Sequence, residues 1–385
     1  MNFDTTSSFE SVYIHWPFCP YKCHFCPFVA LASHDQFMPQ YHRMLCKEIR
    51  DFCQQVDQKS SIKTVFLGGG TPSTYPNDLL LDMFGTLNNA LTLDETAEIS
   101  IEVNPGTVNQ ERLETWKQVG INRLSIGVQS LKDDVLKKLN RHQSAADVFR
   151  LLDSAHLLFD NISVDIILGL PGVSVDDWKE LLETLVTWPI KHMSMYFLTV
   201  HEDTPLYFGV KAKKIMLPTD DTIVDLYEWS VNYLALHGFA RYEISNFARQ
   251  GYESRHNSVY WHRKPYKGFG LGACSFDGKN RFQNQKNLTN YLEGVDQGKN
   301  IHSFSETLTQ EQEWLEIVML GLRQSQGVRI ADVIHNLTPE QRTNFYQKIN
   351  ILRDENLLTC NDDVVRLTSS GLAVENEIVL KLSMI

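Results

Sequence analysis

The sequence predicts an α/β fold with a parallel sheet, followed by a smaller, mostly helical domain. Short apolar or β-branched runs alternate with longer segments of helical spacing over roughly the first 200 residues. Several of these runs end in glycine, proline or asparagine, as in LGGGTP, EVNPGT and LGLPG. Loops therefore follow the carboxyl ends of the strands, where parallel α/β sheets and barrels carry their active sites.

The expected elements follow one another in regular order. Strands are expected at residues 12–15, 64–67, 99–103, 123–128, 163–168 and 193–200. Helices are expected at residues 36–55, 78–91, 110–120, 145–159 and 176–188. From about residue 303 the pattern changes to helices at 310–322 and 339–350, and then to LLTCNDDVVRLTSSG, which has hairpin features. We therefore expect a main α/β domain at 1–240, a connecting segment at 241–302 and a winged-helix-like domain at 303–385.

The composition disfavours several classes of protein. The formal net charge is -11, and nonspecific affinity for nucleic acid comes mainly from clustered lysine and arginine. The amino terminus has no basic segment followed by an apolar one, and no later run approaches ~18 apolar residues. We therefore expect a cytoplasmic protein without a nucleic-acid partner.

Three of the seven cysteines, Cys19, Cys23 and Cys26, lie in the segment YIHWPFCPYKCHFC directly after an expected strand. Three thiolates on one short loop can hold three irons of a cubane cluster, which leaves the fourth iron open to another ligand. A structural zinc normally closes its coordination with four protein groups. A zinc site that combines these thiols with His15 or His24 stays open as the alternative.

This segment resembles the cysteine motif of the radical S-adenosylmethionine (SAM) superfamily. The resemblance implies a [4Fe-4S] cluster, SAM as a cofactor and a partial (β/α)6 TIM-type barrel. It also implies reductive cleavage of SAM to methionine and a 5'-deoxyadenosyl radical. Composition alone does not predict this chemistry.

Residues and resemblance together indicate a SAM pocket. The run LGGGTPS follows a strand and frees backbone groups for close approach by a ligand. A charge at Asp165, inside an otherwise apolar strand, is costly unless it is paired or faces a ligand. Glu102 ends a strand, where a carboxylate can accept from ribose hydroxyls or an ammonium. The positions that the resemblance carries over to SAM are Tyr13, Phe25, Gly69, Gly70, Thr71, Glu102, Gln129, Arg141 and Asp165.

Longer sequence segments indicate which branch of the superfamily this chain resembles. The segments GGGTPS, NRLSIGVQS, DIILGLPG and RYEISNFARQGYESRHNSVYW are similar to the coproporphyrinogen III oxidase-like branch and, within it, to the HemW-type heme chaperones. HNSVYW matches an HNxxYW motif associated with heme binding in these chaperones. The resemblance therefore implies heme contacts at His256, Asn257, Tyr260 and Trp261. An imidazole suits an axial position on iron, and aromatic rings offer flat faces to a porphyrin.

Several positions depart from the family pattern. Pro27 replaces the usual aspartate, Ser254 replaces a frequent cysteine, and Cys274 stands where the family has histidine. A Cys274 thiolate is therefore an alternative heme ligand. Phe28 stands where the true oxidases of this branch carry a further cysteine. These oxidases also have an amino-terminal extension, which we do not expect in this chain.

Three functions stay open at this level. The favoured one is a heme chaperone that binds heme and delivers it to acceptor proteins, membrane-bound respiratory proteins among them. The second is an enzyme of porphyrin biosynthesis, an oxygen-independent coproporphyrinogen III oxidase that decarboxylates propionates. The third is a zinc-stabilised binding module. The sequence leaves open whether SAM cleavage is productive and which oligomer forms, a homodimer included.

Overall fold

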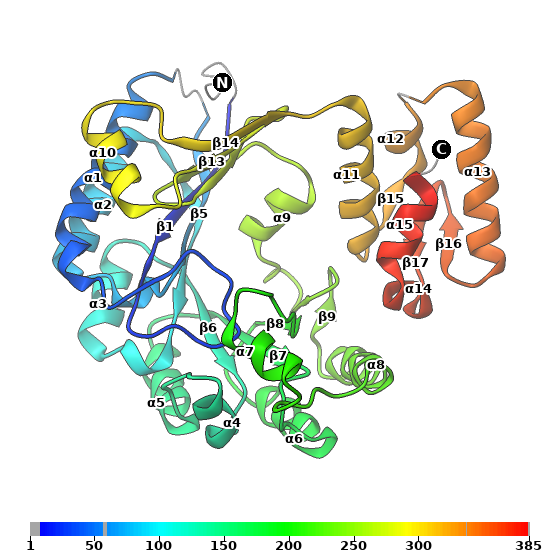
Figure 1. Ribbon diagram of the computed structural model, residues 1–385, viewed down its shortest axis with the longest axis horizontal. Coiled ribbons are helices and arrows are strands. Elements are labelled where there is room, and N and C mark those ends of the chain that lie inside the picture. The colour runs from blue at the N-terminus through cyan, green and yellow to red at the C-terminus, as the bar shows by residue number, and fades with distance from the viewer. Residues whose placement is uncertain (1–7, 57–59, 336, 384–385) are drawn as a thin grey trace.

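The main body of the computed structural model, which describes residues 8–56, 60–335 and 337–383, is built around one nine-stranded sheet (Figure 1). The strand order is β11-β1-β4-β5-β6-β7-β8-β10-β9, and β1 through β8 of this order are mutually parallel. The parallel strands are β1 (Ser11–Trp16), β4 (Ile62–Gly69), β5 (Leu93–Val103), β6 (Arg123–Gln129), β7 (Asn161–Leu168) and β8 (His192–Phe197). The expected α/β fold is confirmed, with all six expected strands present.

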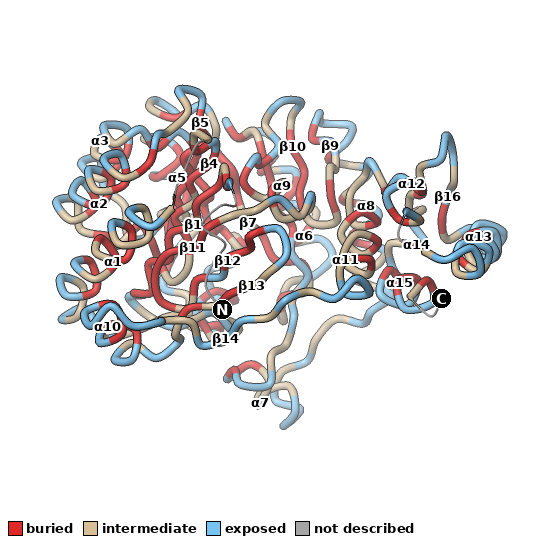
Figure 2. The backbone as a smooth tube through the Cα atoms, turned by 90° about the horizontal axis from the view of Figure 1, so that it is seen from above, coloured by how far each residue is buried: buried red, intermediate tan, exposed pale blue. Residues whose placement is uncertain are grey.

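Helices follow each of these strands in the chain. They are α1 (Met38–Cys53), α2 (Asn77–Ala90), α3 (Gln110–Gln118), α4 (Asp133–Lys138), α5 (Ala145–Ala155), α6 (Val175–Leu185), α7 (Pro205–Lys211) and α8 (Asp220–Leu236). Most of them cover the outer face of the sheet (Figure 1), whereas α7 stands apart from it (Figure 2). Capping boxes fix the starts of two of them, Ser144 with Asp147 in α5 and Ser174 with Asp177 in α6. Burial follows the helical period, so each helix packs one apolar face on the sheet.

The main body continues past residue 240. Strand β10 (Asn246–Ala248) pairs with β8 and β9 (Ala240–Arg241), and β11 (Lys267–Phe269) extends the sheet beside β1. Helix α10 (Leu288–Asp296) also packs on the large core. The segment expected to connect two domains, residues 241–302, therefore packs largely as part of the main body. Strands of two or three residues are too short to show a period in the sequence.

A small antiparallel sheet leads out of the main body. It consists of β12 (Cys274–Phe276), β13 (Asn280–Asn284) and β14 (His302–Thr307). A second short pair, β2 (Phe18–Cys19) with β3 (Leu31–Ala32), closes the loop that carries the clustered cysteines.

The C-terminal domain has an apolar core of its own, with Trp314, Val318 and Leu352 among its buried residues. Its helices are α11 (Gln310–Arg323), α12 (Ile330–Ile334), α13 (Pro339–Asp354), α14 (Ser369–Ala373) and α15 (Glu375–Ser383). The strands β15 (Val328–Arg329), β16 (Leu358–Asn361) and β17 (Val364–Leu367) form its sheet. Helices followed by a hairpin are the expected winged-helix-like order.

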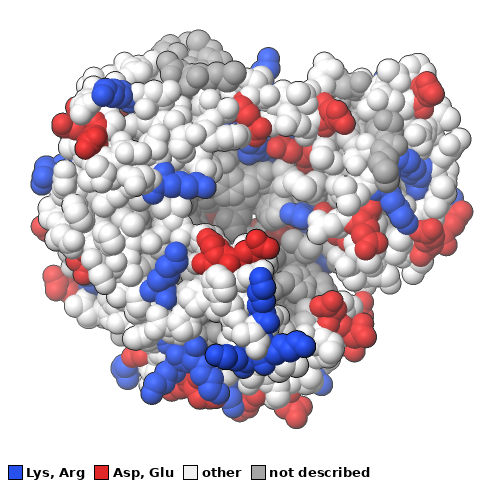
Figure 3. Space-filling view, in the orientation of Figure 1, with Lys and Arg blue, Asp and Glu red and all other residues white. Residues whose placement is uncertain are grey.

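Burial is concentrated in the strands of the large sheet, while the helices turn exposed residues outward (Figure 2). On the face shown in Figure 3, acidic and basic side chains are interspersed, and the surface is hollowed near the middle. In the described part of the chain, every helix falls short of the length and apolarity that a membrane crossing requires.

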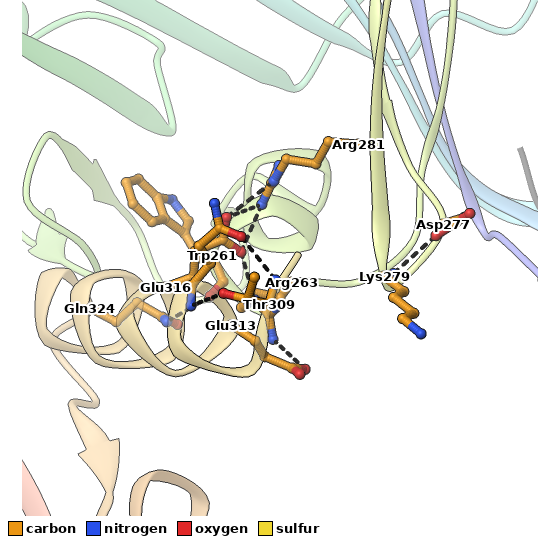
Figure 4. A network of polar contacts seen from close by, with 10 residues as sticks. Trp261, Arg263, Asp277, Lys279, Arg281, Thr309, Glu313, Glu316 and Gln324 are labelled. Atoms are coloured by element: carbon orange, nitrogen blue, oxygen red, sulfur yellow. Dashed lines mark hydrogen bonds and ion pairs between the residues drawn. The ribbon is translucent and has the colours of Figure 1, made fainter. Parts of the chain in front are cut away.

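An ion-pair cluster holds the C-terminal domain against the main body (Figure 4). The carboxylate of Glu316 on α11 accepts from Arg281 Nε at 3.1 Å and Nη2 at 2.9 Å, and from Arg263 Nε at 2.9 Å. Arg263 Nη1 also contacts Glu313 at 3.2 Å. We call these four residues the Glu316 cluster. Bidentate arginine–carboxylate pairs fix orientation as well as distance.

We expect Glu316→Ala to loosen the C-terminal domain. Loss of this carboxylate leaves two guanidinium groups without their shared partner, at a cost of about 1–3 kcal/mol in unfolding free energy. Glu313→Ala is the matched control, because Glu313 is 43% exposed against 18% for Glu316 and contacts one arginine. Thermal unfolding and limited proteolysis near residues 303–308 measure the effect. Equal behaviour of the two variants would show that the Glu316 cluster does not hold the domains together.

Candidate cluster and cofactor site

A cavity of about 470 Å³ opens at the carboxyl ends of the parallel strands. We call it the barrel cavity. The cysteine loop forms one wall, and the ends of β4 to β8 form the rest. The predicted site residues that line it are Cys19, Cys23, Phe25, Cys26, Gly69, Gly70, Thr71, Glu102, Gln129, Arg141 and Asp165. The structure thus brings together side chains that span almost 150 residues of sequence.

Backbone hydrogen bonds hold the cysteine loop at the mouth of this cavity. The N–H of Thr71 donates to the carbonyl of Phe18 at 2.9 Å. The Thr71 hydroxyl lies 3.1 Å from Cys19 Sγ. At the other end of the loop, the His24 N–H donates to the Leu139 carbonyl at 2.9 Å. Burial raises the pKa of the Cys19 thiol to about 11, so binding of iron would have to displace its proton.

Among the described residues, the thiols of Cys19, Cys23 and Cys26 are not gathered as closely as three ligands of one zinc ion. Sulfurs bound to one zinc lie about 3.8 Å apart, because each Zn–S bond is about 2.3 Å long. Within the described residues, one group of three potential metal ligands has all its ligand atoms within 4.8 Å of one another. This group is His42, Cys46 and Asp82, which lie outside the barrel cavity. Thiolates of a cubane bind separate irons and need the wider spacing.

The two histidines of the zinc alternative are engaged elsewhere. His15 Nε2 lies 2.9 Å from the Val29 carbonyl and its Nδ1 lies 3.0 Å from the Tyr13 hydroxyl. Burial lowers the pKa of His15 to about 4. His24 Nδ1 lies 3.2 Å from the Lys138 carbonyl. A zinc ion would therefore compete with existing hydrogen bonds of either ring.

Glycine is required where β4 ends. At Gly69, whose φ is +119°, an added Cβ would lie 2.5 Å from the His15 ring. At Gly70 it would lie 2.5 Å from the Pro17 carbonyl oxygen. The bare backbone instead lets the Gly70 N–H donate to the Trp16 carbonyl at 2.8 Å. The run GGG therefore sets the distance between β4 and the cysteine loop.

Two carboxyl groups inside the cavity favour a cationic ligand. Glu102 accepts from the Gly69 N–H at 3.0 Å, and Asp165 accepts from the Ser125 hydroxyl at 3.0 Å. Burial and, to a lesser extent, the nearby Asp165 carboxylate together raise the pKa of Glu102 to about 8. Burial also raises the pKa of Asp165. A cation placed between them would lower both pKa values and be held in return.

Arg141 connects the cluster loop to the strand ends. Its Nη2 donates to the Gly127 carbonyl at 2.8 Å, its Nε to Gln143 at 2.9 Å, and its Nη1 lies 3.8 Å from Cys23 Sγ. Gln129 has a φ of +64° at the point where β6 shifts register against β7. This irregularity turns the end of β6 toward the cavity.

Some lining residues were not predicted. Tyr21 and Asn104 form a 2.7 Å hydrogen bond at the rim, and Tyr196 and Phe197 face the cavity from the end of β8. The rule that parallel strands present their carboxyl ends to the site points to Asn104, Tyr196 and Phe197. Tyr13 was predicted as a contact but does not belong to the lining among the described residues; its ring stacks on Phe66.

The predicted heme ligand His256 lies in a buried setting on α9 (Arg255–Trp261) and is 1% exposed. Its Nδ1 lies 2.8 Å from the Thr64 hydroxyl and its Nε2 lies 2.8 Å from the Tyr260 hydroxyl. The ring stacks on Phe66. Burial lowers the pKa of His256 to about 3. Ligation of iron by this ring would require one of these hydrogen bonds to break and the ring to become accessible.

The other heme residues divide between the two sides of α9. Tyr260 turns inward to His256, whereas Trp261 lies at the carboxyl end of the helix, where its carbonyl accepts from Gln324 at 3.2 Å. Asn257 sits in the first turn, with its N–H donating to the Ser254 hydroxyl that caps the helix. Cys274, the alternative ligand, is exposed on β12. The motif therefore does not converge on one point.

Two family models match this chain, one in the main body and one in the C-terminal domain. A family model of the radical SAM superfamily matches residues 13–185, and a model of the HemN C-terminal domain matches residues 308–374. Heme chaperone HemW of Bacillus subtilis (strain 168) is 31% identical over 371 residues, 96% of this chain and 98% of that protein. Heme chaperone HemW of Synechocystis sp. is 35% identical over 345 residues, 86% of this chain and 82% of that protein.

A solved structure shares the fold over nearly the whole length. Coproporphyrinogen III oxidase (HemN) from Escherichia coli, a radical SAM enzyme, superposes with a TM-score of 0.84 at 22% identity, covering 99% of this chain and 91% of that one. The expected radical SAM barrel with a separate C-terminal domain is thereby confirmed.

The buried Glu102 carboxyl predicts a pH-dependent stability. Because its folded pKa of about 8 exceeds the usual value of 4.5, the folded chain keeps a proton that the unfolded chain loses between these pH values. Stability contributed by this proton is present below pH 4.5 and is lost as the pH rises through 8. In the cofactor-free protein, Glu102→Gln should therefore raise the unfolding midpoint more at pH 8.5 than at pH 5.5, by about 2 °C or more.

The control is Glu95→Gln, since Glu95 lies exposed on the same strand. Thermal unfolding at the two pH values should show no such difference for this variant. Equal pH dependence of native protein and Glu102→Gln would mean that Glu102 does not titrate as a buried group.

Proposed function

We propose that this chain, which belongs to the radical SAM superfamily and, within it, to the HemW family, is a heme chaperone that binds heme and transfers it to acceptor proteins. The observation that carries the proposal is the identity with HemW proteins over nearly the full length of this chain. The barrel cavity, which Cys19, Cys23 and Cys26 line, supports the proposal.

We assign the [4Fe-4S] cluster to Cys19, Cys23 and Cys26, whose thiols lie at the mouth of the barrel cavity. When bound, the reduced cluster and SAM supply radical chemistry by cleavage of the sulfonium. The chain's own part is to position SAM: the glycine backbone at 69–70 allows close approach, and Glu102 and Asp165 offer negative charge to its cationic groups. Arg141 keeps the loop and the strand ends in register.

The remaining predicted SAM contacts have different surroundings. Phe25 packs against the apolar cluster around Leu170 and Leu206 at the cavity wall, a position suited to an adenine face. Gln129 presents a side-chain amide to the same space. Tyr13 acts through His15, and we assign it to support of the cysteine loop.

Heme is the cargo of this proposal, and the HNSVYW segment is the part of the chain that we assign to it. His256, supported by Tyr260, fixes α9 on the sheet, and the Asn257 N–H donates to the capping Ser254 hydroxyl; Trp261 lies at the helix end. The acceptor would be a protein that receives heme, membrane-bound respiratory proteins among the candidates.

The alternative is an oxygen-independent coproporphyrinogen III oxidase, which shares the fold. Phe28, 64% exposed beside the cluster loop, stands where the oxidases carry a further cysteine. A phenyl ring cannot ligate metal or transfer a proton, so this wall of the cavity lacks a reactive group of the oxidases. Phe28 supports the chaperone proposal for this reason.

One anaerobic preparation tests the assignment. After reconstitution with iron and sulfide, we expect about four irons per chain, lost in a Cys19→Ser, Cys23→Ser, Cys26→Ser triple variant. A Cys53→Ser, Cys360→Ser double variant is the control and should keep its iron, because both residues lie outside the cavity. Heme should bind stably, and coproporphyrinogen III with SAM and dithionite should give no decarboxylated product.

The contrary outcomes are distinct. Zinc without sulfide in the purified protein would favour the zinc-stabilised binding module. Stoichiometric decarboxylation would make the chain an oxidase despite Phe28.

A further inference from the structure

A second group of metal-binding side chains lies in the helical layer of the main body. His42 and Cys46 are four residues apart on α1 and therefore share one face of that helix. Asp82 reaches them from α2, which packs beside α1 (Figure 1, Figure 2). We call these three residues the α1–α2 site. They lie outside the barrel cavity, so the site is separate from the one assigned to the cluster and SAM.

The three ligand atoms form a triangle of the size that one metal ion needs. Cys46 Sγ lies 3.8 Å from His42 Nε2 and 4.0 Å from Asp82 Oδ2, and these last two atoms lie 2.9 Å apart. The centre of this triangle is about 2.1 Å from each corner, and bonds to zinc are about 2.0–2.3 Å long. Cys46 Sγ is equally far, 3.8 Å, from His42 Nδ1, so the ring must turn toward the sulfur to present Nε2 to a shared ion.

The second ring nitrogen of His42 has a partner that suits metal binding by the first. Nδ1 lies 2.9 Å from the hydroxyl of Tyr75, which is fully buried and whose ring stacks on Trp16. A hydroxyl can accept as well as donate. Nδ1 can therefore carry the ring proton while Nε2 offers its lone pair to a metal, which is the usual arrangement of metal-binding imidazoles.

Burial and ligand type favour zinc over other cations. His42 and Cys46 are 4% and 2% exposed, whereas the side chain of Asp82 is 68% exposed. Solvent thus reaches the site from the side of Asp82. One sulfur, one nitrogen and one oxygen ligand form a mixed set that zinc accepts, while magnesium and calcium prefer oxygen alone. Three protein ligands leave the fourth tetrahedral position to water.

The hydrogen bond between His42 and Asp82 does not by itself require a metal. The additional feature is the Cys46 thiol beside this pair. Cys53, at the end of the same helix, belongs to no comparable group of potential ligands among the described residues. Asp78, exposed one turn before Asp82 on α2, belongs to none in that part of the chain either. Cys53 and Asp78 therefore serve as matched controls.

We propose that His42, Cys46 and Asp82 bind one zinc ion, which links α1 to α2. The inference is independent of the proposed heme transfer. On binding, the Cys46 thiol releases its proton to solvent, and His42 keeps one proton on Nδ1. Sγ, Nε2 and a carboxylate oxygen each donate a lone pair to the ion, without transfer of electrons. The chain is then a protein with a zinc ion in addition to its cluster.

The test is an anaerobic zinc titration of the full, cluster-loaded chain against a chromophoric zinc chelator, with iron measured in the same samples. We expect about one zinc beside about four irons per chain. X-ray absorption at the zinc edge should show one sulfur at about 2.3 Å and nitrogen or oxygen ligands at about 2.0–2.2 Å. Cys46→Ser and Asp82→Asn should each weaken zinc binding by about tenfold or more. Cys53→Ser and Asp78→Asn should keep the native affinity.

Circular dichroism and iron content check the fold of each variant, and Asp82→Asn, at the surface, tests the site even if Cys46→Ser fails to fold. Native zinc affinity in a folded Cys46→Ser or Asp82→Asn variant overturns the proposal. Two or more sulfurs around zinc also overturn it, because they place the ion on other cysteines. One sulfur in the native chain, lost in folded Cys46→Ser with the controls unchanged, supports it. Iron content and heme binding test the proposed function separately from these readouts.

Discussion

The close approach of β4 to the cysteine loop is the constraint on which the rest of the site depends. Any side chain at Gly69 or Gly70 would collide with the His15 ring or the Pro17 carbonyl. With glycine there, backbone hydrogen bonds bring Thr71 within 3.1 Å of Cys19 and turn the Gly69 N–H toward Glu102. The cluster ligands and the cofactor cavity are therefore assembled by main-chain contacts. Such contacts depend on the path of the backbone and do not require a bound cofactor.

Hydrogen bonds to backbone N–H groups also fix α9 near the start of β4. Glu98, 6% exposed, accepts from the N–H groups of Arg255 and His256, and thereby satisfies two donors at the start of α9 that the helix itself cannot satisfy. His256 adds hydrogen bonds to Thr64 and Tyr260. The buried part of the HNSVYW segment therefore holds a short helix in place. Trp261, at the end of the helix, is only partly buried.

The period of the sequence predicted the parallel strands, whereas the resemblance to the radical SAM superfamily supplied most of the eleven predicted residues that line the barrel cavity. It did not predict the short strands β10 and β11, whose three residues gain their stability from neighbours in the sheet. The assignment of His256 to heme came from the resemblance of HNSVYW to a family motif. Burial and tertiary partners decide whether a histidine is accessible, and these come from Thr64, 192 positions away.

One strand joins the two regions. Thr64, near the start of β4, holds α9, and Gly69, at its end, contacts Glu102. A strand paired on both sides does not lengthen, so α9 and the barrel cavity keep a fixed spacing. The C-terminal domain has a core of its own and meets the main body through few residues, chiefly the Glu316 cluster and the 324–325 connection. The C-terminal domain, with a core of its own, does not share the constraint that strand pairing puts on α9 and the barrel cavity.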